Sequence, residues 1–259
     1  MRTSNDNLRY RLSQLLTDFP TSRQDELNPL VAERIASART AFIHGFQAAL
    51  KASHENLPNL LKSFPFQKLG FALEGAAMAT TMMDELSNSK DGFLTALLYE
   101  RSETEIVFCA IGVGWATARL RKSPQWLPQC MDIHYKPAVA DGFGFHQGFF
   151  NSQRFTGNRI HGKIGELNDH YYIGLGRALW FAHLGCRENI ALDISKMPPN
   201  QRIQLWRGVG TACAFTGNRE YAAAIMSAAE GFANKLWEGL ENGTQLLHAL
   251  SHLNKKKKL

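Results

Sequence analysis

The sequence predicts an all-α protein in which stacked helical hairpins, repeating about every 34 residues, form a single curved, superhelical domain. Three observations predict this class. Five segments place a glycine inside a run of small and aromatic residues, the stretches between them show helical periodicity, and breaks rich in Gly, Pro, Ser or Asn separate them. The aligned glycines, which are 39, 30, 32 and 34 residues apart, are Gly75, Gly114, Gly144, Gly176 and Gly210.

The chain begins with a polar segment, residues 1–25, which we expect to lie outside the repeat domain of residues 26–253. The first helix of that domain should start at Asn28 and Pro29, since asparagine is a good N-cap and proline suits the first helical turn. An apolar stripe with a period of 3.6 residues follows. It consists of Ile35, Ala38, Phe42, Phe46 and Ala49.

The five repeat segments come next: "FALEGAAMATTMM", "CAIGVGWATARL", "DGFGFHQGFF", "YIGLGRALWFAHLG" and "WRGVGTACAFTG". Glycine inside a helix costs up to about 1 kcal/mol relative to alanine, so its recurrence indicates that neighbouring helices pack backbone to backbone there. "EIVFCAIGV" could form a strand, but its place in the repeat favours a helix. Two further helices are expected in "NREYAAAIMSAAEGFANKLWEGL" and "TQLLHALSHL", followed by a solvated lysine-rich tail, residues 254–259.

Composition indicates a soluble globular protein, with 44% hydrophobic and 20% charged residues. The net charge of +6 owes four charges to the lysine tail, so the body gives no electrostatic sign of a nucleic-acid partner. Neither a signal peptide nor a transmembrane segment is predicted, and four widely spaced cysteines fit a reducing compartment. We therefore expect a cytoplasmic protein.

Polar residues inside the apolar helices are the candidate site. The helical neighbours of Glu74 and Arg177, three and four residues away, are small, aliphatic or aromatic, so both charges should be buried and paired. His146 lies between aromatic residues, and Asp141 begins the same segment. The alternative is structural: a buried Glu74–Arg177 pair that holds the helices in register, and a histidine that is merely part of the core.

In a curved stack, corresponding positions line one concave surface, which here would carry Glu74, Trp115, His146, Arg177 and Thr211. We expect a pocket with aromatic walls, a composition typical of ligand sites. The expected catalytic residues are Glu74, Asp141 and His146. The expected substrate-binding residues are Trp115, Arg119, Phe145, Gln147, Phe149, Arg177 and Trp180.

Other sites receive less support. His161 and His170 lie in a polar loop and should be solvated. His248 and His252 have a spacing compatible with a metal, but a helix face explains them better and no metal site is predicted. The sequence lacks the motifs of Rossmann dehydrogenases, P-loop enzymes, serine hydrolases, HExxH metalloenzymes and di-iron bundles.

The segments "FALEGAAMA", "GVGWATARL", "DGFGFHQGFF", "GLGRALWF" and "GVGTACAFTG", between Phe71 and Gly217, resemble the UnbL-type family of unknown function, which is encoded in enediyne polyketide clusters and elsewhere. The resemblance places the characteristic polar residues of that family on Glu74, Arg119, Asp141, His146 and Arg177. It implies an accessory biosynthetic protein that acts on the conjugated polyene of a polyketide synthase.

Three functions remain open. The first is an enzyme acting on a hydrophobic polyene, polyketide or acyl substrate, in which Glu74, Asp141 and His146 transfer protons or anchor polar groups and Arg177 holds a carboxylate. The second is a non-catalytic helical scaffold or carrier for a protein or a hydrophobic ligand. The third is a metal- or haem-dependent enzyme using His146 with Glu74 or Asp141. The cofactor and the reaction type are unknown.

Overall fold

The computed structural model describes residues 4–15, 29–62, 64–87, 92–150, 165–217 and 219–256. The regular elements in these ranges are all helical, which confirms the all-α fold. The long helices are α2 (Pro29–Lys51), α3 (Phe66–Leu86), α5 (Glu103–Arg119), α6 (Lys136–Phe150), α7 (Asn168–Ala182), α9 (Pro199–Thr216) and α11 (Ala233–Lys256). The shorter helices are α1 (Ser4–Ser13), α4 (Phe93–Leu98), α8 (Arg187–Ser195) and α10 (Arg219–Ala228).

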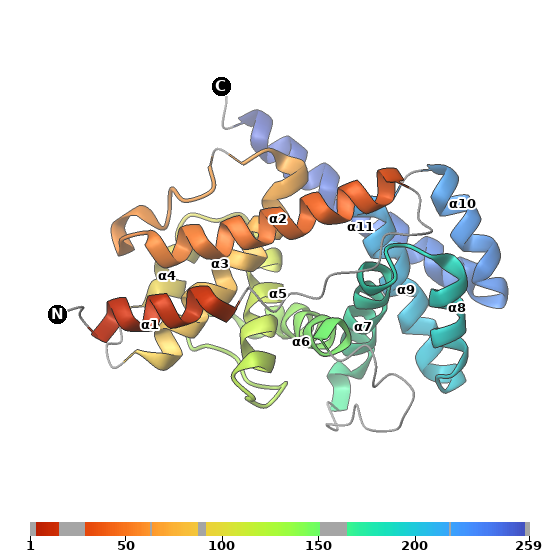
Figure 1. Ribbon diagram of the computed structural model, residues 1–259, viewed down its shortest axis with the longest axis horizontal. Helices are drawn as coiled ribbons and strands as arrows, with labels where there is room; N and C mark the ends of the chain where they lie inside the picture. Colours follow the sequence, from red (N-terminus) through yellow and green to blue (C-terminus); the bar gives the residue numbers. More distant parts are fainter. Residues whose placement is uncertain are drawn as a thin grey trace.

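The long helices form a row in which each packs against the next in chain order (Figure 1). The row curves back on itself, because α11 also packs against α3 and α5, and α2 touches α9. The short helices α4, α8 and α10 follow α3, α7 and α9 and pack beside the row. The result is a single domain whose long helices surround a common interior.

The expected segment boundaries fall close to helix ends. Helix α1, within the polar segment 1–25, packs on α2 and α3, where it buries Leu12. Helix α2 starts at Pro29, while Asn28 lies outside the described residues. The segment that could have been a strand lies within α5, which begins with a capping box between Ser102 and Glu105. At the other end, α11 extends to Lys256, into the expected lysine tail.

Glycines hold the row together through direct backbone contact. In α6, a Cβ atom added to Gly142 would lie 1.9 Å from the carbonyl oxygen of Ile111 in α5, and one added to Gly144 would lie 2.1 Å from that of Tyr171 in α7. Residues two apart on a helix point in directions about 200° apart, so the two glycines face opposite neighbours. The Gly-x-Gly pair therefore lets one helix approach two others.

The same arrangement recurs along the row. Glycines whose added Cβ atoms would meet the backbone of the preceding helix are Gly75, Gly112, Gly142, Gly174, Gly208 and Gly239. Those that meet the following helix are Gly45, Gly114, Gly144, Gly176 and Gly210. The predicted backbone packing is thus found at successive helix contacts within the described ranges.

One detail of the predicted alignment is wrong. Gly75 contacts the preceding helix, α2, and so corresponds to Gly112 and not to Gly114. In α3 the position of the second glycine is taken by Ala77, whose Cβ lies near Gly112 of α5. The correct alignment of α3 with the other repeat helices therefore differs by two residues from the predicted one. The reason is that alanine replaces the second glycine, at a contact where a methyl group fits.

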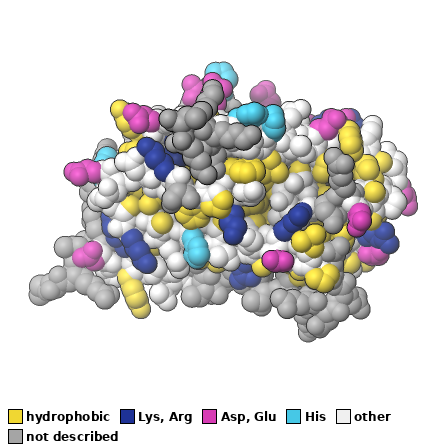
Figure 2. Space-filling model, turned by 90° about the horizontal axis from the view of Figure 1, so that it is seen from above, with side chains coloured by type: hydrophobic (Ala, Val, Ile, Leu, Met, Phe, Trp, Pro, Cys, Tyr) yellow, Lys and Arg dark blue, Asp and Glu magenta, His cyan; other side chains and the backbone are white. Residues whose placement is uncertain are grey.

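Charged and hydrophobic side chains are interspersed on the face turned toward the viewer in Figure 2, which is the top of the molecule in Figure 1. Among the described side chains in that view, neither charge forms a continuous field of the kind that nucleic-acid binding uses. None of the helices in the described ranges combines the length and the apolar character needed to cross a membrane.

We expect Gly144→Ala to lower the free energy of unfolding by at least about 2 kcal/mol, because the new methyl group would meet the backbone of α7 and force the two helices apart. Gly231→Ala is the matched control, since no atom lies within 4 Å of a Cβ placed there. Urea denaturation of both variants measures the difference. Equal stability of the two variants would contradict the backbone contact.

Candidate functional site

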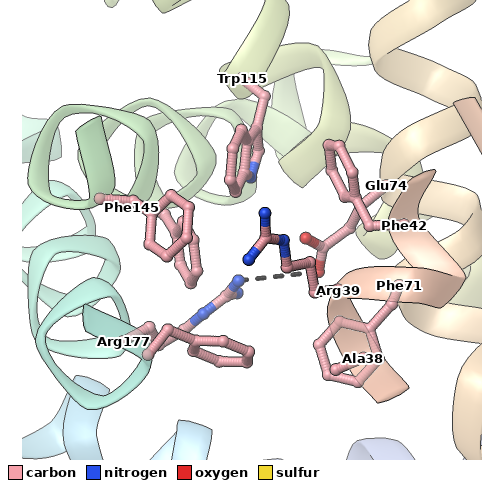
Figure 3. A pocket seen from close by; sticks show the side chains of 10 residues that line it. Ala38, Arg39, Phe42, Phe71, Glu74, Trp115, Phe145 and Arg177 are labelled. Atoms are coloured by element: carbon pink, nitrogen blue, oxygen red, sulfur yellow. Dashed lines mark ion pairs between the residues drawn. The ribbon is translucent and has the colours of Figure 1, made fainter. Parts of the chain in front are cut away.

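A cavity of about 30 Å³ lies in the interior enclosed by the long helices (Figure 3). Its walls combine aromatic rings with the carboxyl group of Glu74 and the guanidinium groups of Arg39 and Arg177. We call it the α2 chamber, because α2 supplies Ala38, Arg39 and Phe42. The other lining residues are Phe71, Glu74, Trp115, Phe145, Phe149, Arg177 and Phe181.

A second cavity of about 20 Å³, the α9 chamber, shares four lining residues with the first. The shared residues are Phe71, Glu74, Arg177 and Phe181, and the others are Phe108, Ile111, Thr211, Ala212, Phe215 and Leu246. Each chamber has room for about one or two water molecules. The Glu74–Arg177 pair therefore lies where the two chambers meet.

The lining follows from the helical repeat. Trp115, Phe145, Arg177 and Thr211 each come directly after the second glycine of a Gly-x-Gly pair, so the same position on four helices points inward. Residues four positions further on lie on the same helix face. Phe149, Phe181 and Phe215 occupy those positions in α6, α7 and α9.

Arg177 sits between two carboxyl groups. Its Nη2 lies 3.6 Å from Oε1 of Glu74 and its Nη1 lies 3.0 Å from Oδ1 of Asp141. The second contact is an ion pair without hydrogen-bond geometry. The guanidinium carbon is 5.0 Å from the centre of the Phe145 ring, which adds a cation–π contact. The three charged side chains form what we call the buried triad.

Burial changes the proton affinity of the buried triad. The pKa of Glu74 rises to about 7, mainly because burial disfavours the charged form; Arg177 lowers it and Asp141 raises it. Burial also raises the pKa of Asp141, with Arg177 and His170 acting in the opposite direction. With both carboxylates ionised the triad carries one net negative charge. Uptake of one proton neutralises it, so Glu74 can exchange a proton near neutral pH.

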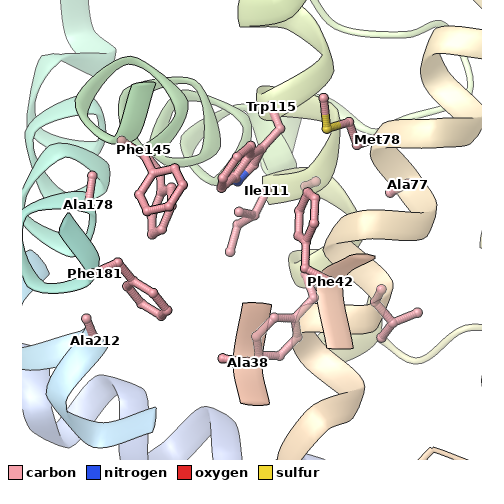
Figure 4. Close-up of a cluster of buried hydrophobic side chains, with 14 of the residues drawn as sticks. Ala38, Phe42, Ala77, Met78, Ile111, Trp115, Phe145, Ala178, Phe181 and Ala212 are labelled. Carbon is pink, nitrogen blue, oxygen red and sulfur yellow. The ribbon is translucent and has the colours of Figure 1, made fainter. Parts of the chain in front are cut away.

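Aromatic rings line the same interior, where Phe42, Trp115, Phe145 and Phe181 point toward a common space (Figure 4). The ring centres of Phe42 and Trp115 are 4.8 Å apart, those of Trp115 and Phe145 are 4.9 Å apart, and those of Phe145 and Phe181 are 5.3 Å apart. Phe71 closes the wall at 6.1 Å from Phe181. Apolar rings lower the polarity around the buried triad, so each charge acts more strongly than it would in bulk water.

Five of the ten expected site residues line the chambers: Glu74, Trp115, Phe145, Phe149 and Arg177. Asp141 touches Arg177 but is absent from both linings, so it acts on the chambers through the guanidinium group. Arg119, His146, Gln147 and Trp180 lie outside both linings. About half of the expected site residues therefore meet around these two small cavities.

His146 lies one position around α6 from the inward-facing Phe145. Its ring packs edge-on against Trp115 and beside Phe150, whose ring centre is 4.8 Å away, and Arg119 also approaches Phe150. Neither ring nitrogen has a hydrogen-bond partner among the described residues. Burial lowers the pKa of His146 to about 3, with Arg119 adding to the effect. The imidazole is therefore neutral at physiological pH.

Trp180 faces away from the chambers. It is fully buried, donates a hydrogen bond from Nε1 to Oγ1 of Thr216 at 2.7 Å, and meets the ring of Tyr221 edge-on. Its role in this structure is to join α7 to α9 and α10. Gln147 is half-buried on α6 and belongs to neither lining.

Several residues of the site are absent from the sequence-based prediction. Phe181 follows Arg177 by four positions and Phe71 precedes Glu74 by three, so helical spacing could have identified both. Arg39 gave no such signal, because it reaches the α2 chamber through the packing of α2 on α3. His170, which we expected to be solvated, is half-buried and close enough to lower the pKa of Asp141.

The described residues contain no group of three or more His, Cys, Asp or Glu side chains arranged to hold a metal ion. His146 also shows no contact with Glu74 or Asp141, the residues that the metal hypothesis grouped with it. His248 and His252 do approach each other, with their Nε2 atoms 3.1 Å apart on the exposed face of α11.

The fold and the site define an all-α protein whose glycine-packed helices enclose a small aromatic interior with a buried acid–arginine–acid triad. The chain belongs to the family described as "Protein of unknown function (DUF1702)", whose model matches residues 11–246. No curated protein and no solved structure matches the chain.

We expect the stability of the protein to depend on pH through Glu74. Because folding raises the pKa of Glu74 from 4.5 to about 7, its contribution is fully present below about pH 4.5 and is lost as pH rises to about 7. Glu74→Gln lacks this dependence. Relative to the wild type, the variant should gain roughly 3 kcal/mol of unfolding free energy between pH 4.5 and 8.

Urea denaturation of both proteins across this pH range measures the gain. His146 has the opposite dependence, because its lowered pKa makes stability fall as pH drops below about 6.5, but both proteins contain it and its effect cancels. Parallel stability curves for the wild type and Glu74→Gln would show that Glu74 titrates normally.

We expect Arg177→Met to lower the unfolding free energy by roughly 3–5 kcal/mol, because it leaves two buried carboxyl groups without their cation. Arg207→Met is the matched control. It removes the Arg207–Glu238 pair, whose side chains are 31% and 37% exposed, so that solvent screens the charges and the pair adds little to stability. Chemical denaturation compares the two variants, and equal losses would argue against a buried charge network.

Proposed function

We propose that the chambers form an acid–base site for an apolar substrate that carries a carbonyl group. The observation that carries the proposal is the position of Glu74, a buried carboxyl group with a pKa of about 7, beside Arg177 in an aromatic cavity. A general acid–base group works best when its pKa lies near the working pH. The guanidinium supplies a fixed positive charge where an oxyanion would form.

These groups suit proton transfer next to a carbonyl group. The ionised Glu74 removes a proton from the carbon beside the carbonyl, and the electron pair of that C–H bond moves into the enolate, whose oxygen Arg177 stabilises. Glu74 then returns the proton to a carbon further along the conjugated system. The net result is migration of a double bond, which needs no additional reactant.

Asp141 acts as a positioning residue in this proposal. Its carboxylate holds Arg177 from the side opposite Glu74 and raises the pKa of Glu74. His146 has no assigned step, because it lies outside both linings and burial disfavours its protonated form. The aromatic walls favour polyene, polyketide or acyl compounds, in keeping with a cytoplasmic accessory role in biosynthesis.

The small volume of the chambers supports a second candidate, a non-catalytic scaffold. The chambers hold about one or two waters each, and the buried triad also ties α3, α6 and α7 together. In that case Glu74 and Arg177 would serve only the fold. Activity measurements separate the two candidates, since a scaffold gives no turnover in any variant.

A β,γ-unsaturated ketone, 5-hexen-3-one, tests the proposed reaction. We expect the wild-type protein at pH 7 to convert it to the conjugated enone, a reaction that ultraviolet absorbance follows. Glu74→Gln should be at least about a hundredfold slower, the lower end of what one acid–base group contributes. The wild-type rate should rise with pH through about 7, as Glu74 ionises.

Glu238→Gln is the matched control for this experiment. Glu238 precedes a glycine of the repeat and pairs with an arginine, as Glu74 does, but it lies outside both chambers. Its substitution should leave the rate unchanged. A rate equal to the buffer background, or equal rates for the wild type and Glu74→Gln, would contradict the proposal.

A further inference from the structure

The place of the ion pair between the two chambers has a consequence for the shape of the ligand. Glu74 and Arg177 belong to both linings, whereas α2 and α6 contribute only to the α2 chamber, α9 and α11 contribute only to the α9 chamber, and α5 contributes to both. Ala38, Phe42 and Trp115 are unique to the α2 chamber. Ile111 and Ala212 are unique to the α9 chamber.

Both chambers offer apolar surface beside the pair. In the α9 chamber the polar residue besides the shared pair is Thr211, whose hydroxyl donates to the carbonyl oxygens of Arg207 and Gly239 and is therefore already engaged. In the α2 chamber the rings of Phe42, Trp115 and Phe145 form the walls, and the guanidinium group of Arg39 extends from α2 into the space beside the pair (Figure 3).

We propose that the ligand has a central oxygen function with an apolar arm on each side, one arm in each chamber. A ligand that extends from one chamber into the other passes the residues that both linings share, which are Phe71, Glu74, Arg177 and Phe181. A compound whose oxygen lies at one end, such as a simple fatty acid, reaches the pair and fills one chamber only. The inference rests on the proposed function, which sets the carbonyl oxygen at these two residues.

The chemistry of the pair agrees with an internal carbonyl group. Arg177 can donate a hydrogen bond to the carbonyl oxygen, while the carboxylate of Glu74 is left to face the neighbouring carbon.

Two isomeric ketones test the inference without any change to the protein. 4-Heptanone carries its oxygen in the middle with a three-carbon arm on each side, and 2-heptanone carries it near one end. The two have the same formula and closely similar hydrophobicity. Ligand-observed NMR titration should give a dissociation constant for 4-heptanone at least about tenfold lower, since only this isomer buries an arm on both sides.

Filling each chamber provides an independent test. Ala38→Leu narrows the α2 chamber and Ala212→Leu narrows the α9 chamber, since both alanines are buried in the lining. Each substitution should weaken 4-heptanone binding at least about fivefold. Binding of 2-heptanone should be weakened only by the substitution in the chamber that holds its five-carbon arm. Thermal melting shows whether each variant is folded. If a variant does not fold, the comparison of 4-heptanone with 2-heptanone on the wild-type protein alone tests the inference.

The outcomes separate this inference from the proposed function. Isomerisation of 5-hexen-3-one together with equal binding of the two heptanones would overturn the two-armed ligand and leave the acid–base site standing. Preferential binding of 4-heptanone that both leucine substitutions weaken, without isomerisation, would support the two-armed ligand and overturn the acid–base function. Binding of 4-heptanone that only one substitution affects would also overturn the two-armed ligand.

Discussion

Each long helix touches the next through a glycine that lies against a backbone carbonyl oxygen, and this contact fixes both the spacing and the register of the helices. Glycine in a helix is unfavourable in isolation, but here it permits dispersion contacts along two whole helix backbones. It also brings Cα hydrogens toward carbonyl oxygens, a geometry that recurs where helices pack closely. Side chains of successive helices consequently enter the interior at corresponding positions.

The same contact sets where the buried charges lie. The carbonyl oxygens that face Gly112 and Gly174 belong to Glu74 and Asp141, so the backbone of each acid is held against the next helix. Arg177 comes from the position after a second glycine, which lies further along the inward stripe. Two acids from one repeat position and an arginine from another thus come together. The glycine contacts hold these three charged side chains at a distance where they can pair, although an apolar interior disfavours charge.

Much of this architecture was predictable from sequence, because glycine recurrence reports a backbone requirement that few other residues satisfy. The burial of Glu74 and Arg177 followed from their helical neighbours alone. The phase of each helix was harder to predict: His146 and Phe145 differ by one residue, which is about 100° around α6, and only packing shows which of them faces inward. Trp180 was assigned to the pocket for its chemistry, although Thr216 draws it to the other side of α7.

Other features depend on contacts between distant parts of the chain. Gly75 was aligned two residues out of register, since Ala77 replaces the second glycine and removes the signal that the neighbouring repeats provide. Arg39 reaches the interior because α2 packs on α3 and touches α9, which no local pattern encodes. Chamber size is likewise a property of the closed arrangement and not of any single segment.

The return of α11 to α3 and α5 links the last helix of the row to two of the first. Until α11 has been synthesised, it cannot cover the inward-facing side chains of the earlier helices, and their aromatic rings stay exposed to solvent. Contacts so distant in sequence are slow to form because a long loop must close first. A ribosome-bound chain would therefore expose the inward-facing aromatic side chains of its earlier helices. The chain is most prone to aggregate in the time before α11 emerges.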